Sequence, residues 1–98
     1  MSTLTIIKPD GTISATTFPG EPPLEALQSA VGGSIEVVPF FNSYEDEPCT
    51  ALCNEDGKGQ GLPHNNTACD LWFPQVGIRR IPGDHLVGPI AIVVPPLR

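Results

Sequence analysis

Apolar residues recur along this chain in short blocks whose spacing differs from one block to the next. Leu24, Leu27 and Val31 follow the i, i+3, i+7 spacing of one helix face, and two prolines suited to a first turn precede them. Gly32 and Gly33 come directly after Val31, and glycine readily adopts the left-handed conformation that ends a helix. The pattern predicts a helix over about residues 22–31.

Other blocks are rich in Thr, Val and Ile, which is the composition of strands. In chain order they are Leu4–Ile7, Ile13–Phe18, Ile35–Phe40, Thr50–Cys53 and Ile90–Val94. The first two flank a Lys-Pro-Asp-Gly turn and are predicted to form a hairpin. The last block is apolar at every position, as in an inner strand that is covered on both faces.

A second short helix is predicted to begin at Asn65 or Asn66 and to end at Trp72, because Asn accepts hydrogen bonds from free amides at a helix start. Residues 73–83 contain two prolines and are predicted to be irregular. Together the elements predict one α+β domain over residues 1–98. It has a small, mainly antiparallel sheet of about five strands, with one or two short helices packed on one face.

The composition favours a turn-rich domain that does not bind nucleic acid directly. The chain has 98 residues, 12 of them Pro and 10 Gly, and a formal charge of −6 from eleven acidic and only five Lys or Arg residues. Five Lys and Arg residues are too few for the several phosphate contacts that direct binding of nucleic acid needs. No basic leader or long apolar run is present, so a cytoplasmic location and no membrane partner are expected.

The chain also contains enough sulfur and nitrogen atoms for a zinc site, but their spacing does not favour one. The candidates are Cys49, Cys53, Cys69, His64 and His85. No C-x-x-C pair occurs, so no metal and no cofactor are predicted and the cysteines are expected to be free thiols. A cysteine nucleophile is also disfavoured, because carboxylates next to Cys53 oppose formation of its thiolate.

Three segments together resemble a known family. ALQSAVGGSIEVVPF, ALCNEDGKGQGLPHN and GDHLVGPIAIV occur in this order, and the chain from about Leu24 to Val94 is similar to the domain of unknown function 3846 family of phages, plasmids and bacteria. Residues 41–49 and 73–81 look like extra length. The resemblance implies an accessory protein of a phage or mobile element, one that blocks host defence by sequestering a signalling nucleotide or by binding a host protein. A non-enzymatic role is expected because no nucleophile, base and orienting group lie in a recognisable arrangement.

The glycine-rich stretch between Asn54 and Asn65 is the predicted ligand site, because glycines let backbone amides converge on an anion. The residues expected to bind a small anionic ligand such as a nucleotide are Asn54, Gly57, Lys58, Gly61, His64, Asn65, Arg79 and Arg80. The loop lacks the G-x-x-x-x-G-K-[ST] order of a phosphate loop, which disfavours nucleotide hydrolysis. The alternative interpretation is that these glycines only shape turns.

The alternative function is binding of a host protein through an acidic loop. Tyr44 is expected to be an exposed anchor, with Glu45, Asp46 and Glu47 around it, while Phe40 and Trp72 are expected to be buried. An exposed sheet edge would also allow a homodimer. Asp84 and His85 are adjacent, but they are not expected to form an acid–base pair, because neighbours on a strand point to opposite faces.

Overall fold

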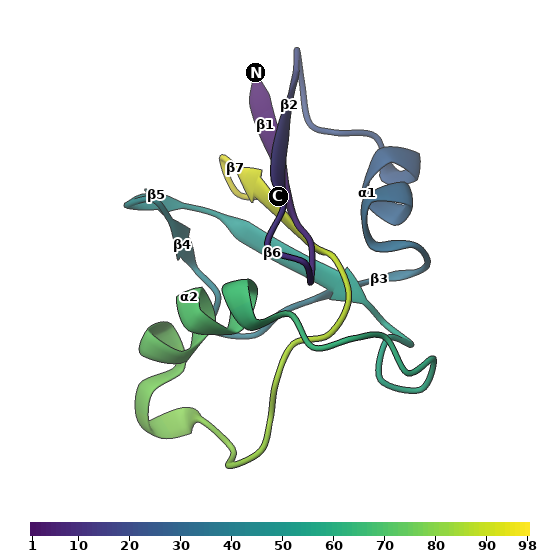
Figure 1. Cartoon of the computed structure of the whole chain (residues 1–98). Coiled ribbons are helices and arrows are strands. Elements are labelled where there is room, and N and C mark those ends of the chain that lie inside the picture. The colour runs from purple at the N-terminus through teal and green to yellow at the C-terminus, as the bar shows by residue number, and fades with distance from the viewer.

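A five-stranded antiparallel sheet in the order β2-β1-β7-β6-β3 organises the chain, and the computed structural model describes all residues from 1 to 98 (Figure 1). The strands of this sheet are β1 (Ser2–Ile7), β2 (Ile13–Phe18), β3 (Ile35–Val37), β6 (Thr50–Asn54) and β7 (Ile90–Val94). The helices are α1 (Leu24–Val31), α2 (Asn66–Val76) and the 3-10 turn η1 (Gly77–Arg79). A separate two-stranded hairpin joins β4 (Ser43–Tyr44) to β5 (Glu47–Pro48). The predicted α+β class and five-stranded antiparallel sheet are confirmed.

The two helices cover opposite faces of the sheet, which differs from the prediction that they share one face (Figure 1). Strand β7 shows why, since alternate residues enter different clusters: Ile90 and Ile92 pack with α2, and Ala91 and Val93 pack with α1. Side chains alternate across a strand, so a strand that is apolar throughout needs a cover on each side. The prediction that β7 is covered on both faces is confirmed.

Helix α1 ends where the paired glycines predicted. Gly32 has a left-handed φ of 79°, and its amide donates to the carbonyl of Gln28. A side chain on Gly33 would meet the amide of Asn54 at 2.9 Å, so glycine is needed for close approach. The Nδ2 of Asn54 in turn donates to the Val31 carbonyl, which ties the end of α1 to β6.

Helix α2 begins as predicted, with Asn65 as its cap accepting a hydrogen bond from the Ala68 amide at 3.0 Å. It continues to Val76 and does not end at Trp72, although Pro74 lies inside it. Val76 is buried one turn after Trp72, so both side chains join the same core. We attribute the longer helix to this burial, which offsets the cost of an internal proline.

The prediction that Phe40 is buried was wrong. Strand β3 ends at Val37, and Phe40 lies in a turn with a left-handed φ of 61° and a side chain that is 41% exposed. This turn directs the next residue, Phe41, into the core. Trp72 is buried as predicted, and its indole N–H donates to the Pro39 carbonyl at 2.8 Å.

Strand β2 forms one free edge of the sheet, and all its residues except Phe18 are exposed. Its sequence carries no charge and no internal proline, which are features that commonly protect edge strands. Neither helix is long and apolar enough to cross a bilayer.

Candidate functional site

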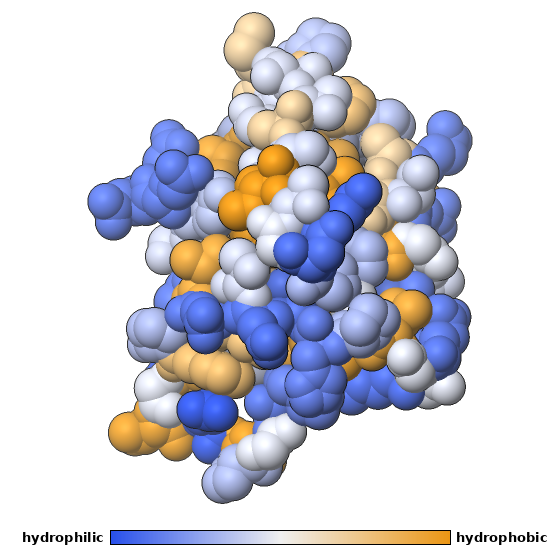
Figure 2. Space-filling view, viewed as in Figure 1, coloured by the Kyte–Doolittle hydropathy of each residue, from blue (hydrophilic) through white to orange (hydrophobic).

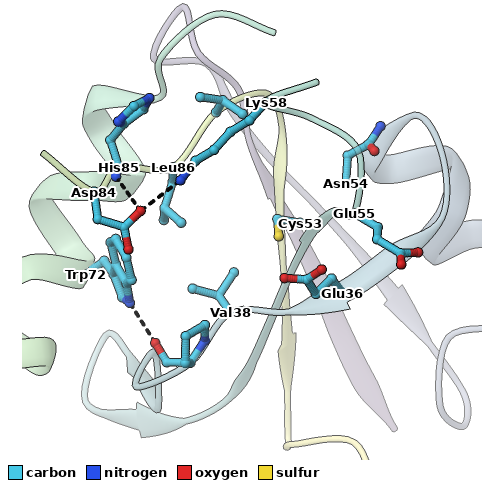
Figure 3. A pocket seen from close by; sticks show the side chains of 12 residues that line it. Glu36, Val38, Cys53, Asn54, Glu55, Lys58, Trp72, Asp84, His85 and Leu86 are labelled. Carbon is cyan, nitrogen blue, oxygen red and sulfur yellow. Dashed lines mark hydrogen bonds and ion pairs between the residues drawn. The ribbon is translucent and has the colours of Figure 1, made fainter. Parts of the chain in front are cut away.

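A cavity of about 240 Å³ lies where β3, β6 and α2 meet the loop that leads into β7 (Figure 3). Its lining residues come from four separate segments and are Glu36, Val38, Pro39, Cys53, Asn54, Glu55, Lys58, Trp72, Asp84, His85, Leu86 and Val87. In Figure 3 the thiol of Cys53 lies near the middle of this ring, and the Glu36 side chain extends into it from β3. The cavity therefore combines apolar walls with several charged groups.

The single cation of the cavity is already paired. Lys58 Nζ lies 2.8 Å from Asp84 Oδ1, and this is the only ion pair within the chain. The hydrogen bond from Lys58 lowers the pKa of the Asp84 carboxyl, against a smaller opposing effect of burial. Glu36 and Glu55 have no such partner, so the lining carries three carboxylates and one ammonium, a formal charge of −2.

Sequence reasoning missed the contribution of Asp84 and His85 to this cavity. They lie in an irregular segment and not on a strand, so the alternation argument used to separate them does not apply. The Asp84 carboxylate accepts from both Lys58 Nζ and the His85 backbone amide. Contacts between residues so far apart in the sequence leave no local pattern, although Asp84 and His85 lie in GDHLVGPIAIV, one of the three segments that carry the family resemblance.

The two histidines of the chain stack on one another. The ring centroids of His64 and His85 are 3.8 Å apart, with an angle of 29° between the planes. His85 Nδ1 lies 2.9 Å from the Gly83 carbonyl, and His64 forms an isolated antiparallel bridge with Val87. His64, predicted to bind a ligand, thus supports the wall residue His85 and is not itself part of the lining.

Several of the predicted ligand residues have structural roles. Asn65 is fully buried, and its Nδ2 donates to the carbonyls of Ile7 and Gly88. Gly57 packs so tightly that an added Cβ would lie 3.0 Å from a Val87 methyl, and Gly61 has a left-handed φ of 69°. Of this glycine-rich stretch, only Asn54, Glu55 and Lys58 line the cavity.

Arg79 and Arg80 do not line the cavity. They lie at η1 and just after it, exposed, with the Arg79 guanidinium carbon 5.0 Å from the ring centroid of Phe40. The guanidinium carbon of Arg80 is 3.6 Å from the centroid of Phe73. The structure therefore separates these two cations from Lys58, with which they were grouped as a ligand site.

The cysteines are free thiols, as predicted. Burial raises the pKa of Cys49 to about 11, and burial together with Glu36 raises the pKa of Cys53. Both thiols therefore stay protonated near neutral pH, a state that is a poor nucleophile. No group of three or more His, Cys, Asp or Glu side chains is arranged to hold a metal ion.

The acidic loop is an ordered hairpin. Its tip residues Glu45 and Asp46 both have positive φ values, 51° and 65°, as a two-residue hairpin turn requires. The Oε1 of Gln75 accepts from the amides of Asn42 and Ser43, and its Nε2 donates to the Ser43 carbonyl, which fixes the hairpin base to α2. Tyr44 is half-buried against the core, so it is less exposed than the prediction required.

These features define a small α+β domain with one mixed cavity and an attached acidic hairpin. A family model described as "Domain of unknown function (DUF3846)" matches residues 1–96, so the chain belongs to that family. The suspected membership is thereby confirmed over nearly the whole chain. Searches of curated proteins and of solved structures gave no match.

Proposed function

We propose that this chain is a non-enzymatic binding protein whose cavity receives the cationic end of a small ligand. The observation that supports this best is the charge of the lining, in which Glu36 and Glu55 have no cation opposite them and Lys58 is held by Asp84. An amine or guanidinium group placed among these carboxylates gains charge-assisted hydrogen bonds. A small anion in the same place would meet uncompensated negative charge.

The size of the cavity supports the same ligand class. At about 240 Å³ it is smaller than the roughly 300–1,000 Å³ of sites that enclose a drug-sized molecule. A cavity of this size suits an alkylamine or a single functional group better than a whole nucleotide. Val38 and Leu86 supply apolar contacts for the stem of such a group.

The accessory role in a phage or mobile element remains part of this proposal, because the family resemblance that implied it covers the segments that build the cavity. A chain that binds and holds a small molecule removes it from solution without altering it. Sequestration of a signalling molecule is thus compatible with a cavity whose one thiol, Cys53, is protonated and whose one lysine is paired with Asp84. The predicted anionic, nucleotide-like ligand stays a prediction that the same experiment tests.

The experiment is a thermal-unfolding screen of the whole chain against agmatine, spermidine and adenosine monophosphate. A ligand about tenfold above its Kd adds about 1.4 kcal/mol of stability, which raises the Tm of a domain of this size by roughly 6–11 °C. We expect such a rise with an amine. Cys53 gives a second readout, because a bound ligand shields this thiol from alkylation by a maleimide.

The matched pair of variants is Glu36→Gln and Glu25→Gln. Both remove one carboxylate, but Glu36 lines the cavity and Glu25 is exposed on α1. We expect Glu36→Gln to lose the amine-dependent rise and Glu25→Gln to keep it. A rise with adenosine monophosphate alone would support the anionic ligand, and no rise with any probe would contradict a small-ligand function.

A second candidate function, binding of a protein through the acidic hairpin, is favoured by the three hydrogen bonds between the hairpin backbone and the Gln75 side chain. They hold Glu45, Asp46 and Glu47 in one arrangement before any partner arrives, which lowers the entropy cost of binding. Loss of a pull-down interaction with a basic partner in a Glu45→Lys, Glu47→Lys variant would support this function.

A further inference from the structure

A second feature outside the cavity is an exposed apolar and basic surface at the end of α2. We define the arginine patch as the following six residues: Phe40, Phe73, Ile78, Arg79, Arg80 and Ile81. Ile78 is fully exposed and Ile81 is 67% exposed, which is unusual for large aliphatic side chains. In Figure 2 apolar surface in orange and strongly hydrophilic surface in deep blue adjoin at the lower left, where Figure 1 draws the light-green segment that follows α2.

The two arginines of the patch are held in place but have no carboxylate partner in the chain. Each guanidinium stacks over a phenylalanine ring, Arg79 over Phe40 and Arg80 over Phe73. The only ion pair of the chain involves Lys58. Stacked arginines beside exposed aliphatic and aromatic groups have the composition of an interface centre.

The acidic hairpin is complementary to this patch in charge. Its tip and following strand carry three consecutive carboxylates, Glu45, Asp46 and Glu47, and all three side chains are exposed. The patch carries two of the five Lys and Arg residues of the whole chain, and they are adjacent. The chain thus carries its own densest acidic cluster and its own densest basic cluster on separate surfaces.

The hairpin and the patch are fastened to the same element. Gln75 on α2 holds Asn42 and Ser43 at the base of the hairpin, and Arg79 follows four residues later and stacks on Phe40. In Figure 1 the hairpin β4–β5 lies above α2 and η1 lies below it. The two charged surfaces therefore lie on opposite sides of α2.

We propose that two copies of this chain form a dimer in which the acidic hairpin of each copy binds the arginine patch of the other. A two-fold axis that passes between the hairpin and the patch places each surface against its complement on the other copy, as in an isologous interface. The contact covers Ile78 and Ile81, which nothing in the single chain covers. Net repulsion between chains of charge −6 is screened beyond about 8 Å at physiological salt, so the close contacts dominate.

The dimer makes a second copy of this chain the partner of the acidic hairpin. It rests on the proposed protein-binding function of the hairpin and not on ligand binding in the cavity. None of the variants below alters a residue that lines the cavity, so amine binding and dimer formation succeed or fail independently. The cavity is tested by ligand-dependent Tm, and the dimer is tested by mass.

The test is a charge swap followed by light scattering or sedimentation. We expect the wild-type chain to have twice the monomer mass. Arg79→Glu with Arg80→Glu, and Glu45→Arg with Glu47→Arg, should each give a monomer, because like charges then face each other at both contacts. An equimolar mixture of the two variants should form a heterodimer, since each contact again joins opposite charges.

Glu25→Arg with Arg98→Glu is the matched control, because it makes the same kinds of charge change at exposed positions away from the patch and the hairpin. This variant should remain dimeric. We expect each interface variant to raise the dimer Kd at least about tenfold. A monomeric wild type would overturn the proposal. So would a dimer that persists in both interface variants, which would point to pairing through the free edge of β2.

Discussion

The two faces of the sheet are built differently. The face under α1 is covered by six buried apolar residues that all come from regular helix or strand: Leu4, Leu27, Val31, Leu52, Ala91 and Val93. The core under α2 has twelve buried residues and takes four of them from irregular segments: Val38, Phe41, Cys49 and Leu86. The cavity, the stacked histidines and the acidic hairpin all adjoin this second face. One face thus mainly supplies stability, while the other combines stability with the surfaces proposed for binding.

The first way to test this contrast is to remove apolar volume from the α1 face. Leu27 is 4% exposed, and Leu27→Ala should lower the free energy of unfolding by about 2–5 kcal/mol, because it leaves a cavity in a small cluster. Urea unfolding measures the loss. The ligand-dependent protection of Cys53 should be unchanged in the fraction that stays folded.

Leu24 on the same helix is the control, since it is 56% exposed. Leu24→Ala should change the unfolding free energy by less than about 0.5 kcal/mol. Equal losses for the two leucines would contradict the assignment of the α1 face. A change in Cys53 protection in folded Leu27→Ala would mean that the two faces are not independent.

The second test concerns a polar support of the α2 face. Asn65→Ala removes the cap of α2 and leaves the carbonyls of Ile7 and Gly88 without their donor. We expect a loss of about 2–4 kcal/mol, from roughly 1 kcal/mol for the cap and the rest for buried unsatisfied groups. Thermal or urea unfolding checks the value.

The neighbouring Asn66 provides the control because it has the same side chain but is exposed. Asn66→Ala should stay within about 0.5 kcal/mol of the wild type. If both asparagines proved equally tolerant, the three hydrogen bonds of Asn65 would not be what fixes α2 to the sheet. The ligand role predicted for Asn65 would then regain support.

These contrasts also show which parts of the structure the sequence can predict. Helix α1 and the β1–β2 hairpin depend on local signals, namely apolar spacing and the closing glycines, and both were predicted. The choice between Phe40 and Phe41 depends on a left-handed turn between β3 and β4, and composition alone carries no signal for it. The extension of α2 past Pro74 depends on burial of Val76, which is a tertiary effect.

The candidate site was only partly predictable for the same reason. Asn54 and Lys58 were identified from a glycine-rich loop, and both line the cavity. Glu36, Trp72 and Asp84 reach it from distant segments whose meeting depends on strand order and on the path into β7. The net charge of the lining depends on residues that come together only through the strand order. For this reason the sequence alone suggested an anionic ligand, whereas the charge of the assembled lining favours a cationic one.

A third test uses the tip of the acidic hairpin, where stability and binding should change in opposite directions. Glu45 and Asp46 have positive φ values that suit Asn and Gly better. Glu45→Asn with Asp46→Gly should stabilise the fold by roughly 1 kcal/mol, because it relieves two left-handed side-chain positions. The same variant should weaken the proposed dimer, since it removes two of the three carboxylates.

Stability is best compared in the Arg79→Glu, Arg80→Glu background, in which dimer formation does not add to the Tm. Glu45→Gln alone is the control for charge, and it should weaken the dimer while changing stability by less than about 0.5 kcal/mol. A destabilised double variant would show that the tip is not strained. It would also mean that the carboxylates at the hairpin tip do not lower the stability of the fold.

The smallest expected effect is that of the Lys58–Asp84 ion pair at the cavity. Asp84 has a lowered pKa, chiefly through its hydrogen bond from Lys58, so the pair stabilises the fold above the unfolded-state value near 3.8. This stabilisation is lost as the pH falls through the lower folded-state pKa. Because both side chains are partly exposed to solvent, Asp84→Asn should cost no more than about 1 kcal/mol at neutral pH.

Urea unfolding at about pH 7 and at about pH 3 measures this difference, which should shrink in acid and in high salt. Asp70→Asn on the exposed side of α2 is the control and should show no comparable change. A difference between wild type and Asp84→Asn that persists in acid would mean that the pair acts through packing and not through charge. If Asp84→Asn changes stability only slightly but alters amine binding, then the ion pair serves mainly to set the charge of the cavity. Such a role in binding is what distinguishes the α2 face from the α1 face.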